Sequence, residues 1–239
     1  MIVLNDQNVL SLNIAVEIAV ESASLLQMEL TMLTLDIVLL FVSTSLLLCI
    51  APGPDNIFVL TQSMVKGSRA GLFVTLGLST GLLFHTSAVA LGVAVIFQQS
   101  LLAFTVLKVC GAAYLLYLAW GAFHAGSSTI QTGKNDGLNA FALYRRGIFM
   151  NITNPKVSVF FLAFLPQFAH PELGSIPLQI IQLGGLFIFC TLLVFGLVIL
   201  LAGKLGEWLI QRPNAEVVMN RVAGTVFSAL AVKLLFTHR

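Results

Sequence analysis

The sequence Ala-Pro-Gly-Pro-Asp-Asn at residues 51–56 interrupts a long apolar segment. It follows Leu33–Ile50, in which Asp36 is the one charged residue, and it precedes a second apolar stretch, Ile57–Val65. Two prolines and a glycine break a helix, because proline lacks the amide donor and clashes with the preceding turn. A carboxylate inside an apolar segment is costly unless it has a partner or a function. The stretch therefore predicts a broken helix that carries a functional acidic residue, Asp55.

The composition of the whole chain indicates a membrane protein. Of its 239 residues, 58% are hydrophobic and 9% are charged, and the mean hydropathy is +0.97. Soluble domains carry roughly 25% charged residues, so a soluble domain of this size could not cover so much apolar surface. We expect an all-α polytopic membrane protein. The net charge of +2 gives no indication of nucleic acid as a partner. No zinc, haem or nucleotide-binding motif is present, so we expect no cofactor and no metal site.

Apolar segments of spanning length predict six transmembrane helices. The expected spans are Leu33–Val65, Gly71–Phe97, Leu101–Phe123, Gly147–Phe168, Leu178–Ala202 and Val217–Phe236. As one straight helix at about 1.5 Å per residue, the first span would be about 50 Å long. The apolar core of a bilayer is only about 30 Å thick. A kink or a re-entrant half-helix at residues 51–56 is expected to absorb the excess.

The spans divide the chain into a short extension and one transporter domain. Residues 1–31 contain no Lys, Arg, Gly or Pro, and Met32 stands directly before the first span. We therefore expect 1–31 to be a non-functional extension or the product of a misassigned start. The transporter domain, 32–239, would consist of a first repeat at 32–123, a cytoplasmic loop at 124–146 and a second repeat at 147–239.

The positions of the basic residues predict the orientation. Eight of them lie in or beside the loops that follow the first, third and fifth spans: Lys66, Arg69, Lys134, Arg145, Arg146, Lys204, Arg212 and Arg221. Two lie at the C-terminal tail, Lys233 and Arg239. Because cytoplasmic loops carry an excess of Lys and Arg, both termini are expected to face outward.

Two pairs of matching positions predict that the halves are inverted three-helix repeats with broken first helices. Gly-Pro-Asp at 53–55 corresponds to Asn-Pro-Lys at 154–156, and Lys-x-x-Gly-x-x-Tyr at 108–114 corresponds to Arg-x-x-Gly-x-x-Phe at 221–227. Matching interruptions in two halves of a membrane protein are a strong sequence indication of a transporter's binding site.

The two breaks place opposite charges at corresponding positions. Pro54 and Pro155 are predicted to begin half-helices whose free backbone N–H groups face the middle of the membrane. With the prolines aligned, Asp55 lies opposite Lys156. A zwitterion such as an amino acid needs this combination of acceptor and donor. The alternatives are that Asp55 only caps its half-helix and that Lys156 extends to an interface.

Other polar residues within the spans leave more than one interpretation open. Lys108 either lines the pathway or extends outward, and His85 either titrates with a proton gradient or packs through a hydrogen bond. At the second break, the polar side chains can satisfy freed backbone groups or bind substrate; they are Asn151, Thr153 and Asn154. The three cysteines, Cys49, Cys110 and Cys190, are interpreted as small buried hydrophobic residues.

Five segments of the chain together resemble the bacterial lysine exporter (LysE/RhtB) family of amino-acid efflux proteins. They are Ala-Pro-Gly-Pro-Asp-Asn-Ile-Phe-Val-Leu at 51–60, Lys-Gly-Ser-Arg-Ala-Gly at 66–71, Leu-Lys-Val-Cys-Gly-Ala-Ala-Tyr-Leu-Leu-Tyr-Leu at 107–118, Asn-Ile-Thr-Asn-Pro-Lys at 151–156 and Phe-Leu-Pro-Gln-Phe at 164–168. The likeness runs from about Met32 to the C-terminus and is closest to the homoserine/threonine/leucine-type branch.

The resemblance implies a bacterial inner-membrane exporter of a neutral amino acid, driven by the proton or ion gradient. With the charge pattern, it indicates a substrate site at Pro52, Gly53, Pro54, Asp55, Asn56, Lys108, Asn154, Pro155 and Lys156. Asp55 and His85 are the candidates for coupling. The expected partners are the amino acid, a coupling proton or ion and membrane lipid, and the sequence leaves a homo-oligomer open.

The sequence disfavours three alternative functions relative to amino-acid export. A divalent metal-ion exporter of the same superfamily is disfavoured, because hard cations want several carboxylates and only Asp55 lies deep in a span. An intramembrane serine hydrolase would need His85 with Ser79 or Ser87, and no nucleophile motif surrounds them; we expect no enzyme. An assembly factor without transport would not need charges at the middle of the membrane.

Overall fold

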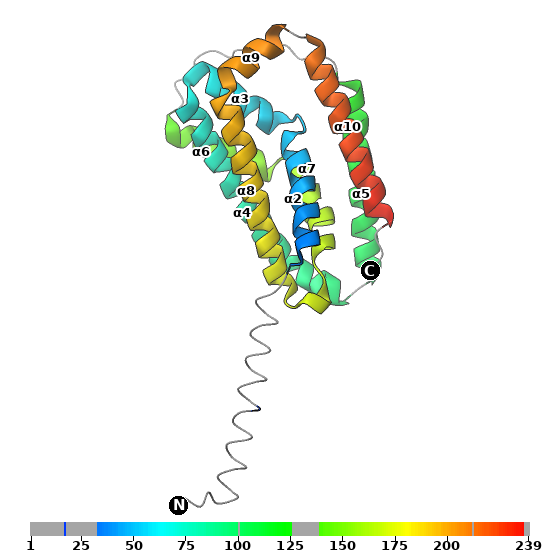
Figure 1. Cartoon of the computed structure of the whole chain (residues 1–239). Coiled ribbons are helices and arrows are strands. Elements are labelled where there is room, and N and C mark those ends of the chain that lie inside the picture. The colour runs from blue at the N-terminus through cyan, green and yellow to red at the C-terminus, as the bar shows by residue number, and fades with distance from the viewer. Residues whose placement is uncertain (1–16, 18–32, 100, 126–138, 212, 237–239) are drawn as a thin grey trace, which may run out of the picture.

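The computed structural model describes residues 17, 33–99, 101–125, 139–211 and 213–236, and all regular elements within them are helical (Figure 1). The elements are α2 (Leu35–Ile50), α3 (Pro54–Lys66), α4 (Ser68–Gln99), α5 (Leu101–His124), α6 (Ala140–Ile152), α7 (Pro155–Val159), η1 (Phe160–Phe164), η2 (Leu165–Phe168), η3 (Pro171–Leu173), α8 (Ile176–Leu200), α9 (Ala202–Gln211) and α10 (Pro213–Phe236). The all-α expectation is confirmed for this part of the chain. The predicted extension at 1–31 lies outside it, Glu17 excepted.

Both predicted broken helices are confirmed. The axis bends by 62° between α2 and α3, and by 49° between α6 and the segment Pro155–Phe168. Pro54 is the first residue of α3 and Pro155 is the first residue of α7. This is the position at which a helix tolerates proline, because the missing N–H would have no partner there.

Several helices have the length and hydropathy to cross a bilayer. Three pass this test alone, at Ser68–Gly92 in α4, Ile176–Leu200 in α8 and Val217–Phe236 in α10. Each bent pair passes it as one broken span, which gives up to five spans within the described residues. Helix α5 covers the segment predicted as the third span. The six-span count itself remains a prediction.

Two loops are shorter than the sequence predicted. Helix α6 begins at Ala140 rather than at Gly147, so the prediction of a loop through residue 146 was wrong for residues 140–146. The Asn139 side chain caps this helix by accepting a hydrogen bond of 2.8 Å from the Ala142 amide. A further helix, α9, occupies part of the predicted loop between the fifth and sixth spans.

Helix α4 packs along α6 and α8. At the crossing with α6, a Cβ added to Gly77 would meet the α6 backbone, and one added to Gly147 would meet the α4 backbone. The lack of a side chain at Gly77 and Gly147 therefore allows the two helix backbones to approach closely. Small residues at such crossings are typical of membrane helices, where packing rather than water drives association.

The remaining long helices form antiparallel pairs. In α4 and α8, Gly71 lies beside Ile199 and Thr86 lies beside Gly184. Helices α5 and α10 run side by side in the same antiparallel sense (Figure 1). An aromatic cluster packs α2 against the second broken helix. The ring centroid of Phe41 lies 6.0 Å from that of Phe160 and 5.1 Å from that of Phe168.

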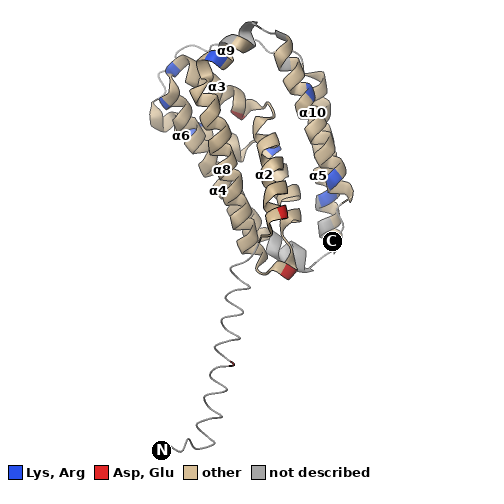
Figure 2. Cartoon of the chain, in the orientation of Figure 1, with Lys and Arg blue, Asp and Glu red and all other residues tan. Residues whose placement is uncertain are grey.

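Charged residues are sparse along the bundle. Figure 2 shows Lys and Arg near the end of the bundle that holds α9 and on α5 and α10, while most of each helix is uncharged. Among the described residues, Asp55 and Lys156 are the buried ionisable pair of opposite charge. The two breaks therefore bring together the charges that the apolar spans would otherwise exclude.

Candidate substrate site

Asp55 and Lys156 meet where the two broken helices approach each other. Lys156 Nζ lies 3.3 Å from Asp55 Oδ1, and each residue is only 6% exposed. Each residue follows the proline that begins its half-helix. The structure therefore brings together the two charges that the sequence places at corresponding positions of the breaks. Burying a lone charge in an apolar environment is very costly, and the ion pair offsets part of that cost for both groups.

The Lys156 ammonium also satisfies the backbone at the first break. It donates to the carbonyl oxygens of Leu48 at 3.5 Å and Ala51 at 3.2 Å, and to Asn56 Oδ1 at 3.4 Å. The last carbonyl groups of a helix have no partner within it. At the end of α2, Lys156 fills part of that role from the opposite half of the chain.

An asparagine supports each break. Asn56 Nδ2 donates to the Cys49 carbonyl oxygen at 2.7 Å, so its amide bridges α2, α3 and Lys156. Asn154 Oδ1 accepts from the Lys156 backbone N–H at 3.0 Å and caps α7. Both side chains therefore help to hold Lys156 in place beside Asp55.

Gly53 leaves room for the pair. A Cβ added there would lie 2.8 Å from Asp55 Oδ1 and 3.0 Å from Lys156 Nζ. Those separations are shorter than ordinary van der Waals contacts, so any side chain at this position would push the charges apart. Pro52 and Pro54 flank Gly53 and keep this part of the chain out of a continuous helix.

A small cavity adjoins the ion pair. Its walls come from both broken helices and from α4 and α8; they are Leu48, Cys49, Asp55, Leu82, Asn151, Lys156, Val157, Phe187, Thr191 and Phe195. The space admits about one water molecule. An amino acid is much larger, so these helices must separate before one can reach the pair.

His85 lies next to this cavity but does not line it. It is buried, and its Nε2 is 3.2 Å from the Asn151 carbonyl oxygen. Its ring centroid is 5.6 Å from that of Phe161. The contact joins α4 to the end of α6, so His85 can influence the site through Asn151.

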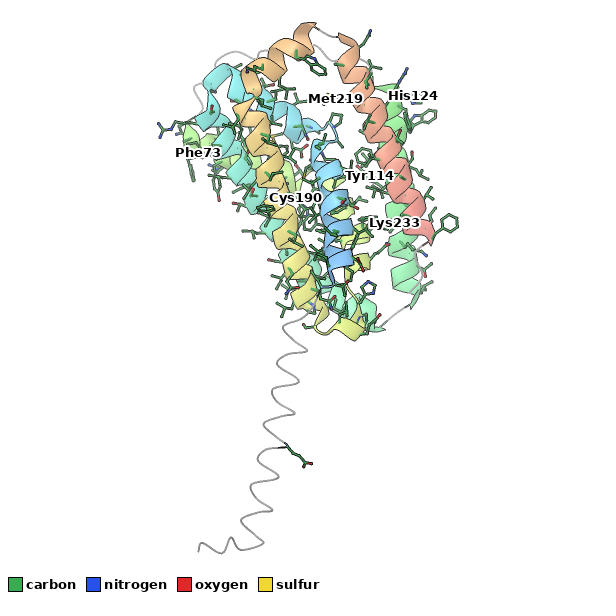
Figure 3. The ribbon with its side chains drawn as sticks, viewed as in Figure 1. Phe73, Tyr114, His124, Cys190, Met219 and Lys233 are labelled. Carbon is green, nitrogen blue, oxygen red and sulfur yellow. The ribbon has the colours of Figure 1, made fainter. Side chains whose placement is uncertain are left out.

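Lys108 is a predicted substrate-site residue that the structure does not bring to the pair. Its Nζ donates to the Leu235 carbonyl oxygen at 3.3 Å, near the C-terminal end of α10. It belongs to the α5–α10 pair, where Figure 3 shows Lys233 as well. Lys233 lies over the Phe164 and Phe168 rings, at 5.5 and 4.8 Å. The sequence gives the depth of Lys108 within its span, but it does not show which neighbouring helix the side chain faces.

The sequence-based reasoning missed two cavity residues, Cys49 and Thr191. Cys49 Sγ lies 3.5 Å from Thr191 Oγ1, and Thr191 also donates to the Phe187 carbonyl oxygen at 2.9 Å. Cys49 is buried, as the sequence predicts, whereas Cys110, also predicted to be buried, is exposed. A threonine in the middle of the otherwise apolar stretch Leu183–Leu200 was the available signal.

The described residues offer no group of three or more His, Cys, Asp or Glu side chains that could hold a metal ion. The carboxylate of Asp55 already has a cationic partner, which disfavours a divalent cation beside it. His85 contacts a backbone carbonyl group through Nε2. These contacts fit the binding of a zwitterion better than metal-ion export or serine hydrolysis.

Comparison with known proteins gives one family match and several curated relatives. The family model described as LysE type translocator matches residues 46–238. A homoserine/homoserine lactone efflux protein of Salmonella typhimurium is 34% identical over 202 residues, covering 81% of this chain and 93% of the relative. An uncharacterized membrane protein of Vibrio cholerae is 32% identical over 196 residues, covering 82% of this chain and 95% of the relative. No solved structure matches the chain significantly.

Proposed function

The chain belongs to the LysE-type translocator family of membrane proteins, and on this basis we propose that it is a secondary active exporter of a neutral amino acid. The proposed substrate is of the homoserine, threonine or leucine type, and the proposed location is the bacterial inner membrane. The observation that carries the proposal is the buried Asp55–Lys156 pair between two broken helices.

The pair suits a zwitterion because the substrate can replace one ion pair with two. The α-ammonium group of an amino acid binds Asp55, and its α-carboxylate binds Lys156. Both protein charges stay paired while the substrate is bound, which avoids the penalty of an isolated buried charge. Asn56 and Asn154 position the two charged residues, while Pro52, Gly53, Pro54 and Pro155 shape the breaks.

Entry of the substrate requires movement of the broken helices. The cavity beside the pair admits about one water molecule, and its walls come from both halves of the chain. Separating the halves would open the site and break the contacts of Lys156 with Leu48, Ala51 and Asn56 together. The ion pair is then both the substrate site and the contact that keeps the site closed.

Six spans in two inverted repeats give this movement a simple geometry. In such a repeat, α4 corresponds to α8 and α5 corresponds to α10. The antiparallel packing of α4 with α8 and of α5 with α10 supports this arrangement, because each helix then packs on its own counterpart. The basic residues at the α9 end of the bundle support a cytoplasmic position for that end and outward termini (Figure 2).

A proton or ion gradient is the proposed driving force. Asp55 is the coupling candidate within the pair, and His85 is the candidate beside it through Asn151. Protonating Asp55 would remove the charge that binds the substrate ammonium group, which links proton movement to substrate movement.

Export from dipeptide-loaded cells tests the function. Cells that express the chain are loaded with dipeptides of each of the twenty amino acids and, separately, with homoserine, and efflux is followed with and without a protonophore. We expect faster efflux of at least one small neutral amino acid, lost with the protonophore or in Asp55→Asn. Unchanged intracellular pools of every amino acid would overturn the proposal.

A further inference from the structure

We propose that Asn151, Cys49 and Thr191 form the subsite for the substrate's side chain, and that this subsite selects a side chain bearing a hydroxyl group. The inference rests on the proposed function, because it assumes that an amino acid binds at Asp55 and Lys156. It adds the residues that distinguish one amino acid from another.

The first observation is an unsatisfied polar atom on a residue that lines the cavity. Asn151 is 3% exposed, and its side-chain oxygen, Oδ1, has no hydrogen-bond partner although it is fully buried. Asn151 also lines the cavity beside the ion pair. A buried acceptor without a donor is destabilising, so a ligand that brings a hydroxyl group would satisfy it.

The position of Asn151 is tightly fixed. A Cβ added to Gly81 would lie 2.6 Å from Asn151 Cβ and 2.7 Å from its Oδ1, so the side chain packs directly on α4. Its backbone carbonyl group contacts His85. An acceptor held in place in this way favours the ligand whose hydroxyl group matches it, because little order is lost on binding.

The second observation is the polar contact between α2 and α8. Thr191 uses its hydroxyl proton on the Phe187 carbonyl oxygen, so its oxygen remains an acceptor for Cys49 or for a ligand. Cys49 and Thr191 are 6% and 3% exposed. They line the same cavity as Asn151, and a space for about one water molecule separates these walls.

These groups predict preference for a hydroxyl group over a methyl group of the same size. A hydroxyl group can donate to Asn151 or Thr191, whereas a methyl group would leave the Asn151 oxygen unsatisfied. Sites built to hydrogen-bond a substrate discriminate strongly against analogues that lack the group. The apolar walls, Phe187 and Phe195, limit the site to a short, uncharged side chain.

The test compares L-homoserine with L-norvaline, in which a methyl group replaces the hydroxyl group. Both are measured as radiolabelled substrates in proteoliposomes that contain the full chain, and the ratio of their kcat/KM values is the readout. We expect the wild type to favour homoserine by about tenfold or more. Thr191→Val and Asn151→Leu, which keep the side-chain shape, should lower that ratio about tenfold and retain norvaline transport.

Thr86→Val is the matched control. Thr86 is a buried threonine in the α4–α8 contact, with the same hydroxyl bond to the carbonyl group four residues earlier, and it does not line the cavity. The ratio should stay at its wild-type value in this variant. If Asn151→Leu fails to fold, the homoserine-to-norvaline ratio of Thr191→Val alone tests the subsite.

The outcomes separate the two proposals. Transport of amino acids with no preference for homoserine, or a ratio unchanged in both cavity variants, would overturn the subsite and leave the proposed function standing. A ratio that also falls in Thr86→Val would show general loosening of the helix contact and would overturn the subsite too. No transport of any amino acid by the wild type would overturn both.

Discussion

The two broken helices are similar in sequence but contribute different chemical groups to the site. At and just before the first break, residues 51–56, the chain presents acceptors: the Asp55 carboxylate, the Leu48 and Ala51 carbonyl groups and the Asn56 side-chain oxygen. At the second, residues 151–156, it presents one strong donor, Lys156. The Lys156 ammonium group is therefore the centre of the site, because this one donor satisfies several acceptors from the other half of the chain.

This asymmetry makes the two charged residues unequal. Without Lys156, the Asp55 carboxylate keeps no hydrogen-bond partner at Oδ1. Without the Asp55 charge, the Lys156 ammonium still has Leu48, Ala51 and Asn56. The following variants test that ranking.

Lys156→Met should have the largest effect. It leaves a buried carboxylate unpaired, so we expect transport to be abolished and the free energy of unfolding to fall by about 3–5 kcal/mol. Unfolding of the purified protein in detergent is the measurement. Adding Asp55→Asn to this variant should restore part of the stability, because the unpaired charge is then gone. A double variant less stable than Lys156→Met would contradict this explanation.

Asp55→Asn should have the second largest effect. Transport should fall about 100-fold with the loss of the charge that binds the substrate ammonium, which corresponds to about 2.7 kcal/mol. Stability should fall by less than about 2 kcal/mol, since Lys156 keeps its other acceptors. Uptake and unfolding measured on the same preparation provide the comparison. The asymmetry is wrong if this variant is less stable than Lys156→Met.

Gly53→Ala should have an intermediate effect on transport and a small one on stability. The added methyl group would enter the space beside Asp55 and Lys156 and push the pair apart. We expect about a tenfold loss of kcat/KM. This is less than the roughly 100-fold loss that a misplacement of about 1 Å can cause, because the side chains of the pair can shift by less than that. Gly185→Ala is the control, because a Cβ added there would meet no atom within 4 Å outside the neighbouring residues and its own helix backbone. Equal losses in the two variants would exclude a specific role for Gly53.

Lys108→Gln should have the smallest effect. Its ammonium group contacts the end of α10 rather than the pair, and the exchange is expected to change uptake by about twofold or less. A loss as large as that of Asp55→Asn in the same uptake assay would contradict this and would indicate that Lys108 belongs to the substrate site.

The sequence predicted the features whose signals are local. Prolines within apolar segments predict both breaks. The charged residues beside these prolines, Asp55 and Lys156, are thereby identified as candidate site residues. The early start of α6 also had a local signal, the capping residue Asn139, which was overlooked.

The sequence did not predict the features that depend on how helices rotate. Lys108 lies deep in a span, but its neighbour is set by the pairing of α5 with α10. Cys49 and Thr191 meet only because α2 packs on α8. The period of an apolar helix gives little information on which face is inward, since all its faces are apolar.

The central claim is that Asp55 and Lys156 bind the two charges of one amino acid, and a competition experiment tests it most directly. Uptake of radiolabelled homoserine into proteoliposomes is measured against unlabelled homoserine and against N-acetylhomoserine, which keeps the carboxylate but has no ammonium group. We predict that the acetylated compound competes at least about tenfold more weakly, because Asp55 would face a neutral amide. Equal competition by the two compounds would contradict the claim.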